Sequence, residues 1–148
     1  MTKSNEVYTF LIRSIDGRQQ TATENKVITY TINWESVLPK KYKSFRAVGY
    51  IRVVDDAKNN AEYVFVKVSS LSPKLFDTET NGKTSYLCVG KQYDGNSHKE
   101  YYNLEVDMEG LKVDYPTTNE CTIEMRELDG TLQDVGDYFL WIQFHPIE

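Results

Sequence analysis

Apolar and polar residues alternate along most of this 148-residue chain, and that period of two limits its fold more than any other feature. The stretch ITYTINW, residues 28–34, shows it: Ile28, Tyr30, Ile32 and Trp34 alternate with threonine and asparagine. No window places apolar residues at helical spacing over three turns. Alternation of this kind is typical of strands with one buried face, so the sequence predicts an all-β protein without a helix longer than about two turns.

Eight segments share the alternation and are separated by Gly, Asn, Asp, Ser or Pro. They are residues 6–14, 26–34, 44–54, 62–70, 84–92, 100–108, 121–128 and 136–147. No helical segments lie between them and no repeat of fixed period occurs, which favours two packed antiparallel sheets. The predicted fold is a single eight-stranded jelly-roll β-sandwich spanning residues 1–148. An immunoglobulin-like sandwich is the alternative, although its Cys…Trp…Cys spacing is missing.

The inward positions of these segments predict the core. The expected core residues are Tyr8, Phe10, Ile32, Trp34, Val64, Val66, Leu104, Val106, Ile123, Leu140 and Ile142. Trp34 stands at the end of its segment and is expected to close one end of the sandwich. Pro39, five residues later, prevents the strand ladder from continuing. Cys88 and Cys121 lie in apolar alternating runs and are expected to be buried, reduced thiols.

Charge and composition exclude several classes of protein. The chain has 22 acidic and 17 basic residues, a net charge of −5, whereas a nucleic-acid-binding domain is usually basic. No apolar run approaches the roughly 18–20 residues of a membrane-spanning helix. The first ten residues, MTKSNEVYTF, lack the apolar core of a signal peptide. We therefore expect no nucleic-acid binding, no membrane span and synthesis without a signal peptide.

Motifs for catalysis or metal binding are missing from the sequence. His98 and His145 are the only histidines, too few for a typical zinc site with the two separated cysteines. There is no nucleophile elbow and no glycine-rich phosphate loop. The sequence therefore predicts a protein that is not an enzyme, with no catalytic, cofactor-binding or metal-ligating residues.

The last predicted strand is apolar on both faces. Its inward face carries Tyr138, Leu140, Ile142 and Phe144. Its other face carries Phe139, Trp141 and Gln143. Because contiguous exposed aromatic side chains usually mark a contact, we expect either the 71–83 or 109–120 loop, or another subunit, to cover this face. The predicted interface is Phe139, Trp141 and Gln143, together with Lys40, Lys41 and Tyr42 at the corner after Trp34.

The two ends of the chain resemble a known family. At the N-terminal end the pattern is YTFLIRS, a turn with DG, and then YTINWESVLPKKYKSFRAVGYIRV. At the C-terminal end it is CTIEMRELDGTLQDVGDYFLWIQFHPI. Together they resemble single jelly-roll minor capsid or penton proteins of large eukaryotic DNA viruses and virophages. The resemblance rests on the strands, the Trp-x-x-x-Leu-Pro corner and the LDG hairpin before an aromatic final strand.

The resemblance implies a structural function. The chain would be a capsid component of the virion that associates with itself, with a pentamer as one option, and with other capsid proteins. It is too short to resemble a double jelly-roll major capsid protein and lacks the long insertion of many penton proteins, so penton and minor capsid roles both stay open. A carbohydrate- or ligand-binding β-sandwich module is the alternative, because exposed Tyr or Trp rings can stack on sugars.

Overall fold

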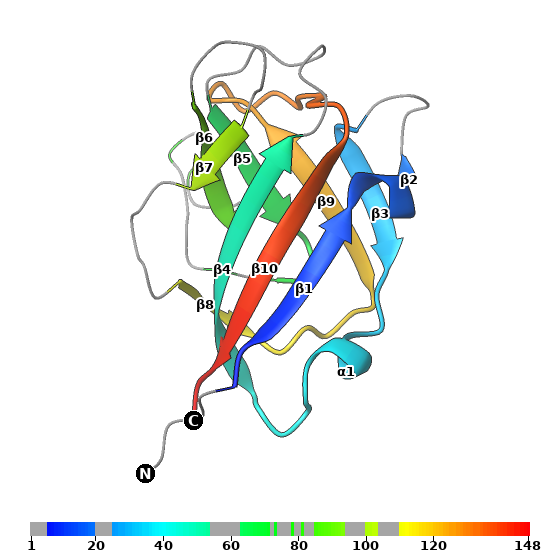
Figure 1. Cartoon of the computed structure of the whole chain (residues 1–148), viewed down its shortest axis with the longest axis vertical. Helices are drawn as coiled ribbons and strands as arrows, with labels where there is room; N and C mark the ends of the chain where they lie inside the picture. Colours follow the sequence, from blue (N-terminus) through cyan, green and yellow to red (C-terminus); the bar gives the residue numbers. More distant parts are fainter. Residues whose placement is uncertain are drawn as a thin grey trace.

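Two antiparallel β-sheets face each other across a shared core in the computed structural model (Figure 1). The structure describes residues 6–19, 25–53, 63–71, 73, 78, 81, 85–93, 100–103 and 110–148. Besides strands, the regular elements among the described residues are a short 3-10 turn, η1 (Ser14–Asp16), and one turn of helix, α1 (Trp34–Val37). The all-β sandwich expected from the alternation is confirmed.

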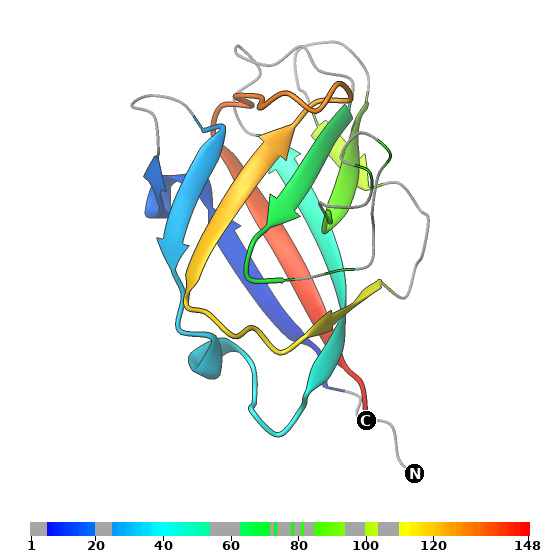
Figure 2. The same cartoon turned by 180° about the vertical axis from the view of Figure 1, so that it is seen from behind.

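The strands divide unequally between the two sheets. The four-stranded sheet contains, in spatial order, β1 (Tyr8–Arg13), β10 (Tyr138–Pro146), β4 (Ser44–Val53) and β8 (Leu111–Asp114). The six-stranded sheet contains β2 (Arg18–Gln19), β3 (Val27–Thr31), β9 (Glu120–Arg126), β5 (Tyr63–Val68), β6 (Cys88–Tyr93) and β7 (Glu100–Asn103). Figure 2 shows the six-stranded sheet from its own side, with β3, β9 and β5 in front.

The order of the strands is that of a jelly roll. β2 and β7 are the two outermost strands of the six-stranded sheet. When they are left aside, eight strands remain, and they pair β1 with β10, β3 with β9, β4 with β8, and β5 with β6. If these eight strands are numbered from one to eight along the chain, the two numbers in each pair add up to nine. This is the pattern of one long hairpin rolled into two sheets, with orders 1-8-3-6 and 2-7-4-5. An immunoglobulin-like sandwich has a different strand order, so the jelly roll is confirmed.

One strand of the jelly roll was missed by the sequence pattern. The predicted strand 100–108 begins as β7, which only extends β6 at the sheet edge, and residues 104–109 lie outside the described residues. The sixth strand of the jelly roll is instead β8, in a stretch that the sequence pattern assigned to a connection. β8 has only four residues and a single fully buried side chain, Val113, so its alternation is too short to detect.

The core lies where the alternation predicts it. Ile32, Trp34, Val64, Val66, Ile123, Leu140 and Ile142 are buried. Tyr8 and Phe10 are partly buried and pack against the same cluster. Leu104 and Val106 lie outside the described residues. Cys88 and Cys121 are buried free cysteines, as expected, and burial raises the pKa of the Cys88 thiol to about 12.

Trp34 closes the lower end of the sandwich, but not as part of a strand. β3 ends at Thr31, and Trp34 begins α1, whose turn is closed by a hydrogen bond from the Leu38 N–H to the Trp34 carbonyl oxygen of 2.8 Å. The Trp34 side chain is 1% exposed and meets the rings of Phe10 and Phe144 edge-on at centroid distances of 5.7 and 6.2 Å. The predicted extension of the strand to residue 34 was therefore wrong, whereas the burial of Trp34 is confirmed.

Candidate functional site

The outer surface of the four-stranded sheet carries a row of large side chains. Trp141 in β10 stands directly opposite Leu11 in β1 on one side and Tyr50 in β4 on the other. Leu11 is 45% exposed and Trp141 is 41% exposed, because their strand neighbours point into the core and turn them outward. Trp141 therefore lies at the middle of an apolar stripe that crosses three strands.

Two further rows flank this stripe. Phe139 lies between Arg13 and Arg52, and Gln143 lies between Thr9 and Val48. Phe139 and Gln143 are half-buried, since their neighbours across the sheet cover part of each side chain. We define the Trp141 face as Leu11, Val48, Tyr50, Phe139, Trp141 and Gln143.

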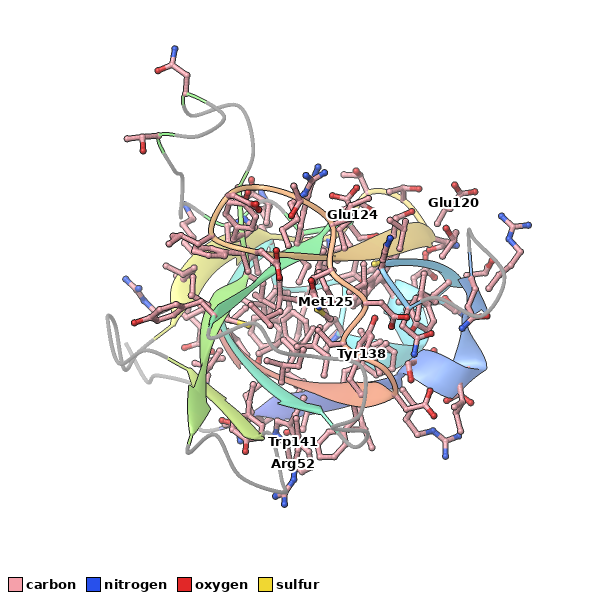
Figure 3. All side chains as sticks on the ribbon, turned by 90° about the horizontal axis from the view of Figure 1, so that it is seen from above. Arg52, Glu120, Glu124, Met125, Tyr138 and Trp141 are labelled. Atoms are coloured by element: carbon pink, nitrogen blue, oxygen red, sulfur yellow. The ribbon has the colours of Figure 1, made fainter. Side chains whose placement is uncertain are left out.

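Basic side chains border the Trp141 face. Arg46 and Lys112 are opposite each other on β4 and β8, and Arg52 is beside Phe139. In Figure 3, Trp141 and Arg52 point away from the core on one side of the molecule, while Glu120 and Glu124 point out on the opposite side. Asp114 on β8 adds an exposed acidic side chain next to Lys112, and Arg13 beside Phe139 pairs with Asp16. The described border of the aromatic patch thus carries more basic than acidic side chains, in a chain whose net charge is −5.

The predicted site residues of β10 lie together, and no described loop covers them. The 110–119 segment leaves Trp141 exposed, and of the loop 71–83 the structure describes only residues 71, 73, 78 and 81. Sequence reasoning missed Leu11, Tyr50 and Arg52 on the same surface. The jelly-roll order itself could have identified them, because it places the first and third strands on either side of the last.

The other three predicted residues lie at a different place, the corner after α1. Lys40 pairs with Glu35 at 2.6 Å, and both side chains are largely exposed. The ammonium group of Lys41 lies 5.1 Å from the centroid of the Tyr42 ring. Tyr42 is only 8% exposed and packs edge-on against Phe45, so most of its ring belongs to the core. An interface role for this corner stays a prediction, as it does for the residues of β10.

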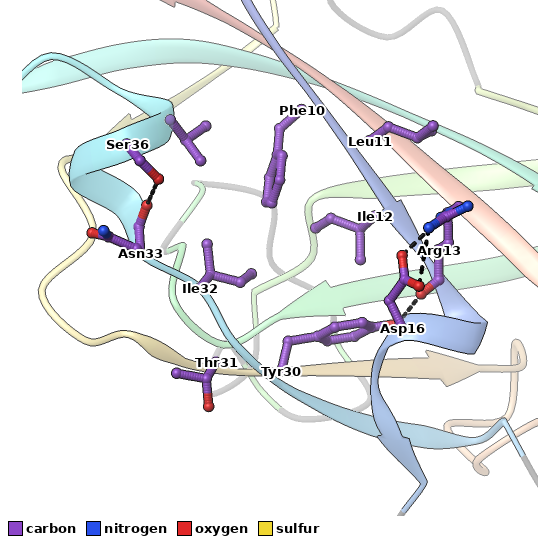
Figure 4. A pocket seen from close by; sticks show the side chains of 11 residues that line it. Phe10, Leu11, Ile12, Arg13, Asp16, Tyr30, Thr31, Ile32, Asn33 and Ser36 are labelled. Carbon is purple, nitrogen blue, oxygen red and sulfur yellow. Dashed lines mark hydrogen bonds and ion pairs between the residues drawn. The ribbon is translucent and has the colours of Figure 1, made fainter.

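A groove of about 290 Å³ opens between β1 and β3, where the edges of the two sheets meet (Figure 4). Phe10, Ile12 and Ile32 give it an apolar floor. The Arg13 guanidinium pairs with Asp16 at 2.7 Å at its rim, and the Tyr30 hydroxyl donates a 3.0 Å hydrogen bond to the carbonyl oxygen of Arg13. Burial raises the pKa of the Tyr30 phenol, so it stays protonated at neutral pH. The charged groups of the groove thus pair with each other.

Metal ligands do not gather in the part of the chain that the structure describes. Within it, no group of three or more His, Cys, Asp or Glu side chains is placed to hold a metal ion. None of the helices in the same part of the chain has the length and apolar character needed to cross a membrane.

Comparisons with known proteins find distant similarity to two solved viral structures. No protein-family model matches the chain, and no curated protein matches it. Among solved structures, the tripod from the baseplate of bacteriophage Tuc2009 aligns over 95% of this chain with a TM-score of 0.35 and 9% identity. The VP2 subviral particle of infectious bursal disease virus aligns over 96% with a TM-score of 0.27 and 9% identity. The chain spans 64% of the first of these chains and 34% of the second. Similarity at this level carries no information about activity, and the strand order of the chain itself defines its fold.

Proposed function

We propose that this protein is a structural, non-enzymatic component of a virus particle, a minor capsid or penton protein that acts by binding copies of itself and neighbouring shell proteins. The observation that carries the proposal is the Trp141 face. It joins exposed Leu11 and Trp141 to Tyr50 and Phe139 on the outer surface of one sheet, with arginine at its border. Central aromatic residues with arginine nearby are typical of protein–protein interfaces.

The jelly roll supports this function by holding the face rigid. Ile142 and Leu140, the neighbours of Trp141 in β10, are fully buried between the sheets. β10 is paired along its whole length with β4 and through six residues with β1. A surface fixed in this way loses little conformational entropy when a partner binds. The proposed mechanism is therefore geometric: the core fixes the sheet, and the outward side chains make the contacts.

The test is the mass of the protein in solution. Light scattering over a range of concentrations is expected to show an oligomer for the unchanged chain. Trp141→Ala is expected to shift the protein toward monomer, because truncating a central interface tryptophan typically costs about 2 kcal/mol or more of binding. Its circular dichroism should keep the β signature. Phe65→Ala, on the outer surface of the six-stranded sheet, is the matched control and should assemble like the unchanged chain.

Two outcomes would contradict the proposal. One is a monomer at every concentration. The other is a monomer whose tryptophan fluorescence is quenched by a sugar, with Trp141→Ala removing the effect. The second result would favour a carbohydrate-binding module, because the exposed indole of Trp141 beside Gln143 could stack on a sugar ring.

A further inference from the structure

We infer that the Trp141 face binds the acidic turn between β9 and β10 of a second copy of this chain, so that copies associate head to tail. The inference rests on the proposed function and adds to it the surface of the partner that docks. The turn lies at the upper end of the sandwich in Figure 1, and the face lies on the side of the four-stranded sheet.

The turn is a tight, internally bonded hairpin. The Gly130 N–H donates to the Glu127 carbonyl oxygen at 3.0 Å, and the Glu127 N–H donates to the Thr131 carbonyl oxygen at 2.9 Å. Gly130 has a φ of 83°, a left-handed conformation that favours glycine and lets the chain turn back. The guanidinium group of Arg126, the last residue of β9, donates a 2.6 Å hydrogen bond to the Gly130 carbonyl oxygen. This network fixes the shape of the turn before any partner binds.

An apolar side chain stands at the tip of the turn. Leu128 is 72% exposed, the highest value among the large apolar side chains that the structure describes. Six such side chains are exposed in the described residues, and four of them are on the two surfaces that we pair: Leu11 and Trp141 on the face, Leu128 and Leu132 on the turn. A rigid tip that exposes leucine suits contact with an apolar, aromatic surface.

The two surfaces are complementary in charge. Residues 127–137 contain four acidic side chains, Glu127, Asp129, Asp134 and Asp137, and no lysine or arginine. Hydrogen bonds from the Thr131 hydroxyl and N–H lower the pKa of Asp129, so it is ionised at neutral pH. The Trp141 face is bordered by Arg46, Arg52 and Lys112. Opposite charges on two surfaces speed their association and determine which surfaces meet.

Face-to-face pairing of two Trp141 faces is disfavoured by the same charges, because it would bring the arginine borders together. A contact between the turn of one copy and the face of the next is heterologous. It leaves one turn and one face unused on every pair, so further copies add until the ring closes or a filament grows.

Two single substitutions separate the two surfaces. Leu128→Lys removes the apolar tip and lowers the net negative charge of residues 127–137 from −4 to −3, yet changes a side chain that packs little in the fold. It is expected to raise the dissociation constant of self-association at least about tenfold. Trp141→Ala should raise it about 30-fold. Thr117 is an exposed residue of the segment that joins β8 to β9, and this segment lies at the opposite end of the sandwich from the turn (Figure 1). Thr117→Lys adds the same charge there and should change the dissociation constant no more than about twofold.

Mixing the two variants is the decisive measurement. Each alone should be monomeric, since Leu128→Lys lacks a working turn and Trp141→Ala lacks a working face. Their equimolar mixture still holds one good turn and one good face, so native mass spectrometry should find a one-to-one dimer that grows no further. Raising the salt to about 1 M, where charges are screened beyond roughly 3 Å, should weaken this dimer.

The outcomes distinguish this inference from the proposed function. If Leu128→Lys assembles like the unchanged chain while Trp141→Ala does not, the face binds something other than the turn, and only the inference is wrong. A mixture that stays monomeric also contradicts it. An unchanged chain that is monomeric throughout contradicts both proposals. If Leu128→Lys loses its β circular dichroism, Leu128→Ala replaces it and should still raise the dissociation constant.

Discussion

Trp34 and Trp141 lie on opposite sides of the same four-stranded sheet. Trp34 meets Phe144 on the inner side of β10, and Trp141 stands on the outer side of that strand, three residues earlier. The first is surrounded by aromatic rings and is 1% exposed, whereas the second touches solvent over much of its indole. The two regions therefore use the same side chain for different ends: Trp34 stabilises the fold, and Trp141 is available to a partner.

The rings around Trp34 explain why that region depends on packing. Phe10, Phe45 and Phe144 form edge-on contacts that continue from Trp34 across the end of the core. Edge-on aromatic pairs contribute about 0.5–1.5 kcal/mol beyond the area that they bury. Trp141 has neighbours only beside it on the outer surface of the sheet, Leu11 and Tyr50, and solvent above it. Removing its side chain therefore leaves no enclosed cavity. The difference shows that alternation predicts which way a tryptophan points, while its surroundings decide what it does.

The largest loss of stability is expected when Trp34 is replaced. Trp34→Ala should lower the free energy of unfolding by about 3–5 kcal/mol, because it leaves a cavity among aromatic rings. For a domain of this size the melting temperature should fall by roughly 10 °C or more. Thermal and urea unfolding followed by circular dichroism would measure it. Equal melting temperatures for Trp34→Ala and Trp141→Ala would remove the distinction between the two regions.

A smaller loss of stability is expected when the hydrogen bond between Tyr115 and the corner after α1 is removed. The Tyr115 hydroxyl donates a 2.9 Å hydrogen bond to the carbonyl oxygen of the buried Leu38. Tyr115→Phe removes that donor and keeps the ring, so it should cost about 1 kcal/mol. Urea unfolding would show it as a lower midpoint with an unchanged slope. A variant as stable as the unchanged chain would mean that the corner is held by packing alone.

Trp141→Ala should cost the isolated subunit less than about 1 kcal/mol, the loss of its cross-strand contacts with Leu11 and Tyr50. The measurement is urea unfolding at a protein concentration low enough for the monomer to dominate, because self-association would add its own stabilisation. A loss as large as that of Trp34→Ala would place Trp141 among the residues that hold the fold.

The smallest effect concerns Asp129 in the turn. Its folded pKa is lowered, so the stabilisation that it provides is complete above the unfolded pKa near about 4 and is lost as the pH falls through the folded pKa. Thr131→Val removes the hydroxyl that donates to Asp129 and should raise the Asp129 pKa toward its ordinary value. NMR titration of the carboxyl carbon would follow it. An unchanged pKa would mean that backbone N–H groups alone stabilise the carboxylate.

Much of the fold could be predicted because the alternation of long strands is local. Ile32, Val64 and Ile142 point inward as the period of two requires. β8 was missed because its place beside β4 depends on contacts between residues far apart in the sequence. Val113 is its one fully buried residue, so the local pattern is weak. Trp34 was assigned to a strand because a helix of a single turn leaves no period to detect.

The candidate site was predictable only in part. The three outward residues of β10 follow from two apolar faces on one strand, but their partners on β1 and β4 depend on strand order. Tyr42 was predicted as an interface residue together with Lys40 and Lys41. The structure turns its ring inward onto Phe45 while Lys41 stays in solvent beside it. Sequence neighbours reveal local charge, whereas burial depends on which distant rings reach the same place.

The nested pairing of the strands also determines when the chain can fold during synthesis. β1 leaves the ribosome early, but Tyr8 pairs with Phe144 and Arg13 with Phe139. Among the described strands its sole partner is therefore β10, which is made more than a hundred residues later. β4 likewise waits for β10 along its length. Pairings so distant in sequence close slowly, since the entropy of a long loop must be lost before contacts form. We expect the four-stranded sheet to assemble after translation of β10, and a nascent chain that stops before Tyr138 to leave β1 an unpaired edge open to aggregation.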